Sequence, residues 1–586
     1  MRCHMDTYRF SKVADRVRLL DGTRLYGVFD QRINALISGL FTRVDMGAVV
    51  DFYRYRLNRF AAGEFFGKLM RAACLVYRYT KNAELKNVID SAAADLMSIQ
   101  DGDGDISTAP KAEQPNGSSG ADLWERKYVL LGLWEYYLAT EDEKALDCMT
   151  RLALYTASQV GDPPKTPVTN TGWAFCGIES SSILEPVVRL YALTGREELF
   201  RLASHIVSSG ACGREDMFAA IMNGKAPKDI GSDGVPEHSI AKAYEMMSCF
   251  EGLLEFYRVT GEEKHLLCAR KFIERINERE ITYLGSGGAD GPYNLGPGTG
   301  EQWNDTFFEQ ANPDIKLSME TCVTITYMKL MLQYYRLTGD ASCIDRIEVS
   351  AYNALLGAMK PDGTFFDYFP KFNGTRSTKV NFSYDINGIP LSCCTANGPM
   401  GMAILPFFAY CMKGDALAVN LYIPSENAYF RMETEYPLNG VVTLVSLFDG
   451  ELPVALRIPG FCDSFTLSEK YKKDGGYAVL EKKTWKKGDR VTLSLDMPLV
   501  CHPCPPSVNP EASGQVLFTY GPLVLARDKS VDPGWDQPVR TVPGTYDGYE
   551  IKDGRLRFED AVFVPYPDAG ASWDDSTEYK CWLRQV

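Results

Sequence analysis

The sequence of 586 residues has no apolar run of the roughly eighteen residues that a membrane-spanning helix needs. Basic residues are also in deficit, because 62 Lys and Arg stand against 76 Asp and Glu, for a net charge of −14. Binding to nucleic acid requires a basic surface, so this balance argues against a nucleic-acid partner. Histidine is scarce, with five residues in the whole chain, so a histidine beside a polar loop stands out.

The sixteen cysteines follow no regular spacing, which excludes the disulfide framework of a small secreted domain. Unpaired and mostly buried thiols are typical of a reducing compartment. The first six residues contain neither an apolar stretch nor a small-residue cleavage site, so they do not resemble a signal peptide. We therefore expect a cytoplasmic protein, with export after removal of a leader as the alternative.

From about residue 30 to residue 405, apolar residues recur at intervals of three and four, which predicts helices. One helix ending recurs five times: a Tyr, two further residues and a Thr, often followed by Gly, and then polar residues that begin the next helix. These endings start at Tyr77, Tyr137, Tyr191, Tyr257 and Tyr335. A spacing of roughly 55 to 80 residues indicates helical hairpins. A closed toroid of about six hairpins, the (α/α)6 barrel, accounts for it.

After about residue 416 the apolar period changes to two, which predicts short strands over residues 418–423, 441–445, 454–458, 491–495 and 516–520. We expect one or two β-sandwich units there, and therefore a multidomain α+β protein. The expected division is lead-in strands over 1–25 that pack on the sandwich, the barrel over 26–412, and the sandwich over 413–586. Within the sandwich, Cys501-His502-Pro503-Cys504 is interpreted as a loop coincidence rather than a metal site.

The stretch 319–397 presents one carboxylate and three thiols, as Glu320 and Cys322 at one end and Cys393 and Cys394 at the other. Ligands of this kind and number suit tetrahedral zinc, although paired Cys-x-x-Cys arms are absent from the stretch. Residues two apart share a target in extended chain, so Glu320 and Cys322 are expected just ahead of a helix. Three interpretations stay open: a zinc–thiolate site that performs chemistry, a closed structural zinc site, and buried cysteines without metal.

Several motifs, in order along nearly the whole chain, resemble the β-L-arabinofuranosidases of glycoside hydrolase family 127. They are Gly63-Glu64-Phe65-Phe66-Gly67-Lys68, Lys242-Ala243-Tyr244-Glu245, Glu320-Thr321-Cys322, Pro361-Asp362-Gly363, Cys393-Cys394-x-x-Asn397-Gly398-Pro399 and Gly521-Pro522-Leu523-Val524. The resemblance implies an (α/α)6 barrel followed by β-sandwich domains. It also implies a retaining exo-glycoside hydrolase that releases a furanose such as β-L-arabinofuranose from plant-type glycans.

The resemblance further implies a zinc ion held by Glu320, Cys322, Cys393 and Cys394, with Cys393 as the nucleophile. A thiol attacks only as a thiolate, and coordination to zinc lowers its pKa. The family places the catalytic acid/base on a Glu in an upstream Gly-rich loop, which here is Glu301. The segment after Glu301 is longer than in the family pattern, so Asp305 and Glu309 are kept as reserves.

Loop placement and the resemblance together select candidates for the sugar subsite: Glu64, Lys68, Trp124, Glu125, Trp173, Glu179, His238, Lys242 and Tyr368. Each has a structural alternative, since the tryptophans suit a core, Lys68 and Glu125 suit the surface, and Glu179 suits a helix cap. Lys68 or Lys242 would serve an acidic sugar. Met400 stands where relatives often carry a basic residue, so another pentose or a branched acidic sugar from pectin is a second possibility.

Three other functions fit less of the pattern. One is a different toroidal carbohydrate enzyme, such as an unsaturated-uronide hydrolase or a lyase. The second is a non-catalytic sugar-binding protein with a structural zinc, and the third is a redox element with a vicinal disulfide at Cys393 and Cys394. The partner we expect is an oligosaccharide, with no nucleic acid and no membrane, and a homodimer is possible.

Overall fold

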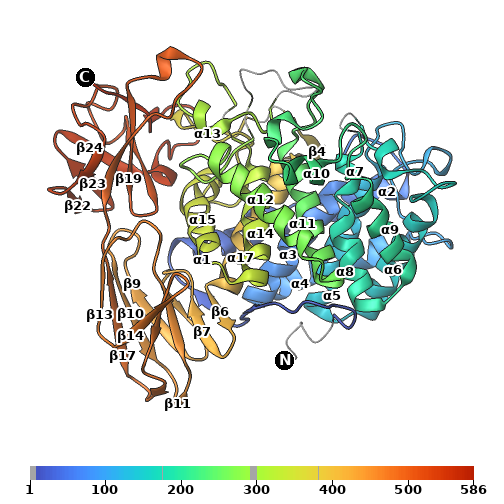
Figure 1. Ribbon diagram of the computed structural model, residues 1–586, viewed down its shortest axis with the longest axis horizontal. Helices are drawn as coiled ribbons and strands as arrows, with labels where there is room; N and C mark the ends of the chain where they lie inside the picture. The colour runs from blue at the N-terminus through green and yellow to red at the C-terminus, as the bar shows by residue number, and fades with distance from the viewer. Residues whose placement is uncertain (1–7, 174–175, 289, 291–299, 318, 380–381) are drawn as a thin grey trace.

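The computed structural model describes residues 8–173, 176–288, 290, 300–317, 319–379 and 382–586. The first six residues, on which the signal-peptide prediction depends, and residues 296–299 of the predicted Gly-rich loop lie outside the described residues. A helical region and a sheet-rich C-terminal region lie side by side (Figure 1). In the described part of the chain no single helix is long and apolar enough to cross a bilayer. One pair bent by 57°, Val28–Phe41 with Met46–Arg54, reaches that length and composition together.

Six helices of the helical region contact one another in sequence: α3 packs against α5, α5 touches α8, α8 packs against α11, α11 against α14, α14 against α17, and α17 returns to α3. Their bounds are Glu64–Thr80 (α3), Asp122–Thr140 (α5), Leu184–Thr194 (α8), Ala243–Thr260 (α11), Thr321–Thr338 (α14) and Cys393–Phe408 (α17). Five further helices each pack against one of these: α4 (Ala83–Ser98), α6 (Glu143–Gln159), α9 (Glu197–Ser208), α12 (Glu263–Arg279) and α15 (Ser342–Ser350).

The burial patterns distinguish the two sets of helices. Helix α11 is buried at every position from Ala243 to Val259. Helix α12 buries only a stripe at helical spacing, from His265 to Ile276, and leaves its other face in water. A helix that is buried all round lies inside a structure, whereas a one-sided stripe belongs to a helix that covers it.

The five repeated helix endings are confirmed. Lys81, Glu141, Gly195, Gly261 and Gly339 all have left-handed backbone, and each donates its amide to the carbonyl of the Tyr four residues earlier. The left-handed conformation costs a residue with a Cβ about 1–2 kcal/mol, which explains why glycine occupies three of the five positions.

The N-terminal lead-in, predicted as strands over 1–25, forms strands within the described residues only at β1 (Val17–Leu19) and β2 (Arg24–Leu25). Residues 8–16 are irregular, and their amides instead bond the helix ends: Phe10 donates to Ala192 O, Lys12 to Arg258 O and Arg16 to Arg336 O. The last carbonyls of a helix have no partner within the helix, and this segment supplies one to α8, α11 and α14. Buried Asp15 reinforces the contact through ion pairs with Arg258 and with Arg336, the latter at 2.6 Å.

From Tyr410 onward the chain consists mainly of strands, which together with β1 and β2 form two six-stranded sheets in the orders β1-β6-β7-β12-β15-β14 and β13-β17-β10-β9-β8-β2. Their bounds are β1 Val17–Leu19, β2 Arg24–Leu25, β6 Tyr410–Lys413, β7 Ala416–Val419, β8 Ser425–Glu426, β9 Phe430–Thr434, β10 Val441–Ser446, β12 Val454–Arg457, β13 Phe465–Leu467, β14 Tyr471–Asp474, β15 Tyr477–Leu480 and β17 Arg490–Leu495. Strands β1 and β2 therefore add the start of the chain to both sheets.

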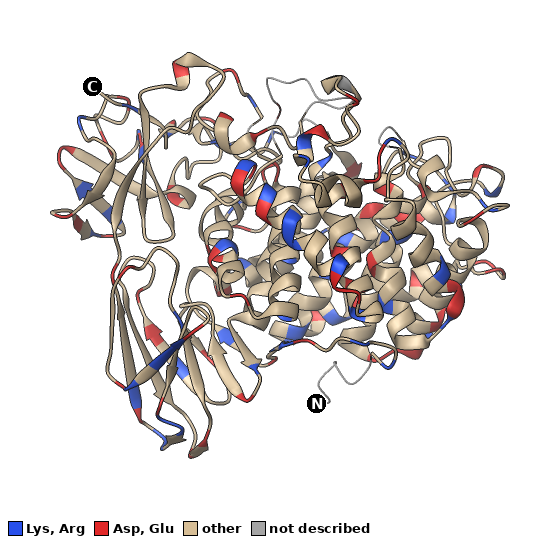
Figure 2. Ribbon diagram, viewed as in Figure 1, with Lys and Arg blue, Asp and Glu red and all other residues tan. Residues whose placement is uncertain are grey.

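A third sheet follows, with the order β21-β18-β19-β20-β24-β23-β22. Its strands are β18 Leu499–Pro503, β19 Gln515–Tyr520, β20 Leu523–Asp528, β21 Gly544–Tyr546, β22 Glu550–Lys552, β23 Arg555–Phe558 and β24 Ala561–Pro565. Cys501, His502 and Pro503 of the motif at 501–504 lie on β18 and not in a loop as expected, and Cys504 follows the strand. Successive strand residues point to opposite faces, so Cys501 and His502 diverge, and His502 instead pairs with Thr519 at 2.8 Å. Acidic and basic residues are interspersed over the helical and sheet regions (Figure 2).

Candidate active site and metal centre

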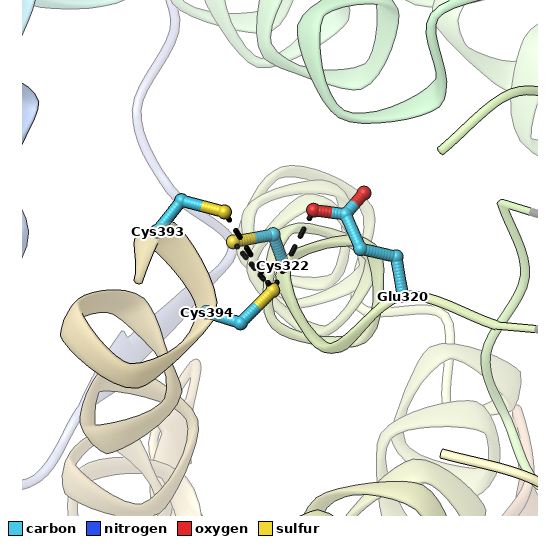
Figure 3. Close-up of side chains that lie close together, drawn as sticks. All are labelled: Glu320, Cys322, Cys393 and Cys394. Carbon is cyan, nitrogen blue, oxygen red and sulfur yellow. Dashed lines mark hydrogen bonds between the residues drawn. The ribbon is translucent and has the colours of Figure 1, made fainter. Parts of the chain in front are cut away.

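The four predicted ligands meet at the N-termini of two neighbouring helices. Glu320 is the extended residue that precedes α14, and Cys322 lies in the first turn of that helix. Cys393 and Cys394 open α17, where the Ser392 side chain caps the helix by accepting from the Thr395 amide. The ligand atoms of all four residues lie within 4.8 Å of one another (Figure 3). Both Glu320 and Cys322 were expected just ahead of a helix: Glu320 lies there, whereas Cys322 already lies within the first turn.

The short distances centre on Cys394. Its Sγ lies 3.4 Å from the Cys322 sulfur, 3.6 Å from a Glu320 carboxylate oxygen and 3.8 Å from the Cys393 sulfur (Figure 3). No disulfide joins the two adjacent cysteines, and every cysteine in the described part of the chain is free. Cys393 is the one thiol of the three that is partly exposed.

The charges in this cluster favour a bound cation. Burial, together with the negative Cys393, raises the pKa of Glu320 to about 8, and burial raises the pKa of Cys322 and Cys394 well above the ordinary thiol value. The second carboxylate oxygen of Glu320 is buried and has no hydrogen-bond partner among the described residues. Four acidic groups without compensating charge are costly in a buried site, and three sulfurs with one carboxylate are donors that a divalent metal accepts.

Cys393 differs from the other two thiols. Burial raises the pKa of Cys393, but hydrogen bonds with Cys322 and Cys394, the charge of Lys68 and a bond with Tyr368 outweigh it, and the pKa falls well below the ordinary thiol value. A helix N-terminus favours a thiolate in the same direction. The partly exposed sulfur is therefore also the one that most readily carries the negative charge.

Lys68 supplies positive charge beside the cluster. Its ammonium is 1% exposed, lies 4.0 Å from the Cys322 sulfur, and forms a 2.8 Å ion pair with Glu64. The rings of Tyr128 and Tyr244 lie 5.2 Å from the same ammonium. Lys68 is therefore a fixed internal cation and not the surface group that was its alternative interpretation.

A chain of hydrogen bonds joins Cys393 to Glu301. The Tyr368 hydroxyl lies 2.9 Å from the Cys393 sulfur and donates to the Glu301 carboxylate, whose other oxygen pairs with Lys242. The backbone carries Glu301 beside α11, because Ala243 N donates to Glu301 O. Glu301 itself has a left-handed backbone, with φ of 59°, an uncommon conformation that occurs often at functional sites.

The two reserve carboxylates are engaged elsewhere. Asp305 accepts from Arg279 at 2.7 Å, and Glu309 accepts from Ser507 and from the Val508 amide near the start of the third sheet. No contact within the described residues joins either of them to Cys393. Of the three predicted acid/base candidates, Glu301 is the one that the hydrogen-bond network connects to the thiol cluster.

Trp124, Trp173, Glu125 and Glu179, which were also predicted for the sugar subsite, all contact neighbouring residues of the protein. Trp124 is 2% exposed and donates through its indole nitrogen to Glu64 at 2.7 Å, with Trp173 packed against it at 5.7 Å between ring centroids. Glu125 is buried and accepts from the Gly63 amide, so it caps the start of α3. Glu179 likewise accepts from the Trp173 amide at 2.7 Å.

His238 lies on the exposed turn Pro236–His238. No contact in the described part of the chain links it to the thiols, and its role in sugar binding stays a prediction. Met400 lies further along α17 and lines a cavity of about 480 Å³, together with Tyr8, Leu19 and Arg336 near the N-terminal segment. The difference between Met400 and the basic residue of relatives therefore alters this cavity and not the thiol cluster.

Sequence reasoning missed two contributors to the site. Glu245, in the first turn of α11, is 4% exposed, and its charge acts together with that of Cys393 to raise the pKa of Glu320. Tyr244, which is hydrogen-bonded to Tyr128, forms one wall around Lys68. Both residues belong to the quoted motif Lys242-Ala243-Tyr244-Glu245 and lie two and three positions after Lys242, so the motif itself was a signal that could have found them.

Comparisons with known proteins agree with this geometry. The family model described as β-L-arabinofuranosidase, GH127 catalytic domain, matches residues 45–406, and the GH127 middle domain matches residues 416–497. A solved GH127 β-arabinofuranosidase is similar over 98% of both chains, with a TM-score of 0.74 and 19% identity. A GH127 β-L-arabinofuranosidase from Geobacillus stearothermophilus T6 is similar over 96% of this chain and 100% of its own, with a TM-score of 0.72 and 18% identity. Among curated proteins, none matches.

The catalytic-domain match covers more than half of the chain and includes all four clustered ligands. The protein is therefore a glycoside hydrolase, in which a carbohydrate is the substrate. Within that class it belongs to the β-L-arabinofuranosidase family, GH127, and the resemblance drawn from its motifs is confirmed.

Proposed function

We propose that the protein is a retaining exo-glycoside hydrolase that releases a terminal furanose such as β-L-arabinofuranose, with Cys393 as nucleophile and Glu301 as acid/base. The observation that carries the proposal is the network Cys393–Tyr368–Glu301–Lys242 beside the cluster of Glu320, Cys322 and Cys394. In this network a thiol of low pKa and a carboxylate both bond to the same hydroxyl group.

The separation of these two groups supports retention of configuration. Because Cys393 and Glu301 bond the same hydroxyl oxygen, their reacting atoms lie no further apart than two hydrogen bonds, about 6 Å. Retaining enzymes separate the two groups by about 5–5.5 Å, whereas inverting enzymes need about 6.5–9.5 Å to fit a water molecule. The short separation favours direct attack by Cys393 over attack by water.

In the first half of the reaction, the Cys393 thiolate attacks the anomeric carbon and the glycosidic C–O bond breaks. Glu301 gives its proton to the leaving oxygen, and a thioglycoside forms on Cys393. In the second half, Glu301 takes a proton from water, the oxygen of that water attacks the same carbon, and the C–S bond breaks. Two inversions return the sugar with its configuration retained and Cys393 as a thiolate.

Tyr368 couples the protonation states of the two catalytic groups. A hydroxyl donates one hydrogen, so Tyr368 donates either to Glu301 or to Cys393. While Glu301 carries its proton it can donate to the Tyr368 oxygen, and Tyr368 then donates to the thiolate. Once Glu301 is ionised, the Tyr368 hydroxyl donates to its carboxylate, and Lys242 pairs with the other oxygen of the same carboxylate.

Glu320, Cys322, Cys393 and Cys394 would hold the metal, and zinc suits this donor set. A zinc ion there would lower the pKa of the nucleophile and stabilise the departing thiolate. Three thiolates and one carboxylate exceed the charge of a dication by two, and Lys68 beside Cys322 offsets part of this excess.

The test compares wild type with Cys393→Ser on methyl β-L-arabinofuranoside. We expect the variant to lose turnover while it keeps its fold, and NMR of the first-formed sugar from wild type to give the β anomer. Near-normal rates for Cys393→Ser would refute the nucleophile, and the α anomer would refute retention. Metal analysis with one zinc per chain supports the ligand set, and its absence after purification with zinc and reductant contradicts it.

Alternative functions are separable by the same measurements. An unsaturated-uronide hydrolase or a lyase would act on acidic sugars and would tolerate Cys393→Ser. A sugar-binding protein with a structural zinc would bind metal and sugar without turnover.

We further propose that the six contacting helices and their partners form the (α/α)6 barrel within 26–412, with lead-in strands 1–25 and a β-sandwich region over 413–586. A cytoplasmic location and a homodimer remain parts of this proposal.

A further inference from the structure

Four aromatic residues near the cluster form a patch that is open to solvent. Phe60 is 42% exposed and Phe382 is 50% exposed, while Trp173 and Tyr384 are partly buried beneath them. The rings of Phe60 and Trp173 lie 5.1 Å apart, those of Phe382 and Tyr384 lie 5.7 Å apart, and the Tyr384 hydroxyl donates to Phe60 O at 2.7 Å. We call these four residues the aromatic rim.

Two routes connect the aromatic rim to the thiol cluster. The first is a run of direct contacts in which Trp173 packs on Trp124, Trp124 donates to Glu64, and Glu64 pairs with Lys68 beside Cys322. The rim is therefore continuous with the wall of the site and is not a separate patch on a distant face.

The second route runs along the backbone. Tyr384 opens β4 (Tyr384–Ile386), which pairs with β5 (Ile389–Leu391), and Leu391 is the partner of Tyr384 in the ladder. Paired Cα atoms lie about 5 Å apart and two residues of extended chain span about 7 Å. The Tyr384 Cα therefore lies within about 12 Å of the Cys393 Cα, a distance that one or two sugar units bridge. Figure 1 places β4 at the same edge of the helical region as α7 (Ile178–Ser181) and α10 (Met217–Met222).

The loop that carries Phe60 is held rigid. Three residues with a Cβ, Arg56, Asn58 and Ala61, have left-handed backbone, with φ of 47°, 47° and 53°. Such strain persists only where the surroundings determine it. Here the Arg56 guanidinium pairs with buried Asp105 at 2.8 Å and with Asp101 at 2.9 Å. An apolar ring that is fixed in water at a cost to the backbone points to a function for its exposed face.

We propose that the aromatic rim binds the leaving-group side of the oligosaccharide, with sugar rings stacked on Phe60 and Phe382. Sugar rings have apolar C–H faces and hydroxyl edges, so they match an uncharged aromatic surface beside a polar loop. The furanose to be cleaved occupies the site at Cys393, and the rest of the chain runs outward over the rim. This inference deepens the proposed function and rests on it, since it makes glycan chains better substrates than simple glycosides.

The experiment compares two substrates with the same terminal furanose: methyl β-L-arabinofuranoside, which ends before the rim, and a tetrasaccharide that ends in β-L-arabinofuranose. We expect Phe60→Ala with Phe382→Ala to reduce kcat/KM on the tetrasaccharide about tenfold more than on the methyl glycoside. The excess loss should appear in KM, because stacking on the rim binds ground state and transition state alike. The matched control is Phe10→Ala, which removes a Phe of similar exposure (46%) beside Tyr191, in the N-terminal segment that bonds the other ends of the helices.

Equal losses on both substrates, or no loss on either, overturn the aromatic rim. Calorimetric binding of the tetrasaccharide tests the rim independently of turnover. If wild type binds the tetrasaccharide and the double variant binds it about tenfold more weakly while neither substrate is cleaved, the rim stands and the proposed function fails. If wild type cleaves both substrates and the double variant binds the tetrasaccharide as wild type does, the rim fails and the proposed function stands. If wild type neither binds the tetrasaccharide nor cleaves either substrate, both the aromatic-rim proposal and the proposed function fail.

Discussion

Replacing Tyr368 with Phe removes one oxygen atom from the centre of the network that joins Cys393 and Glu301. The Tyr368 ring stays, because it is 9% exposed and packs against Phe369 at 4.5 Å between centroids, contacts that Phe reproduces. The Tyr368 carbonyl, which accepts from the Thr321 amide at 3.1 Å, is unaffected, so the start of α14 keeps this contact. The substitution therefore isolates the hydroxyl.

A hydrogen bond to a charged group contributes about 1.5–3 kcal/mol. The Tyr368 hydroxyl makes one such bond at a time, to the thiolate or to the carboxylate, so the expected loss in kcat/KM for Tyr368→Phe is about 10- to 150-fold. The assay is kcat/KM on methyl β-L-arabinofuranoside, with zinc content and thermal midpoint measured on the same samples. The midpoint and the zinc content should match wild type.

The matched control is Tyr335→Phe. Tyr335 is also a buried tyrosine, but its hydroxyl bonds Tyr477 and Asn420, away from the thiols. It should keep full activity. If kcat/KM of Tyr368→Phe stays within twofold of wild type, the hydroxyl does not couple the two catalytic groups. If zinc is lost together with activity, Tyr368 acts on the metal site and the coupling argument is refuted.

Three further predictions follow from the structure. Chelation of the bound metal should lower the thermal midpoint and abolish turnover. Adding zinc back to a free concentration one hundred times its Kd should restore about 2.7 kcal/mol of stability. An unchanged midpoint on chelation would contradict the ligand set. Asp15→Ala should destabilise the protein by up to about 3 kcal/mol in denaturant unfolding, because it removes a buried carboxylate that pairs with Arg258 and Arg336, while Arg258 keeps its pair with Glu255. Asp21→Ala breaks only a pair with Arg78 at the surface and should cost less than about 1 kcal/mol. Equal effects would show that Asp15 does not fix the helix ends. Burial lowers the pKa of His502 to about 4 from an unfolded value of about 6.5. Between about pH 6.5 and pH 4 the unfolded protein therefore binds more protons than the folded protein. The free energy of unfolding should fall as the pH drops through this range, by up to about 3 kcal/mol. His502→Gln, which keeps a partner for Thr519, should remove that part of the pH dependence in unfolding measured from pH 7 to pH 4, and an unchanged slope would refute the assignment.

The sequence predicted what depends on local rules. The five helix endings were found because a left-handed residue after a helix favours Gly and polar followers, and the sheet region because alternation changes the apolar period. The clustering of Glu320, Cys322, Cys393 and Cys394 was predicted because these residue types lie in two motifs that carry a family resemblance, and the structure brings the four together as a group that could hold a metal.

Other features depend on contacts between distant parts of the chain and leave no local pattern. Residues 8–16 have the apolar spacing of a strand, but the free carbonyls at the ends of α8, α11 and α14 compete for their amides. Cys501, His502 and Pro503 were interpreted as part of a loop, yet pairing with β19 makes them a strand. The aromatic rim draws Phe60 and Phe382 from segments more than 300 residues apart, and Tyr384 joins them through its ring contact with Phe382 and its hydrogen bond to Phe60 O.

The two halves of the candidate metal site, Glu320 with Cys322 and Cys393 with Cys394, also bear on how the molecule assembles. Helices α14 and α17 each carry part of the ligand set, and α17 is the helix that contacts both α14 and the early helix α3. A nascent chain thus has no complete set of donors until its last inner helix has docked. Capture of the cation would then mark the moment of ring closure, and a metal-sensitive probe would follow the late, long-range step of folding rather than the formation of individual helices.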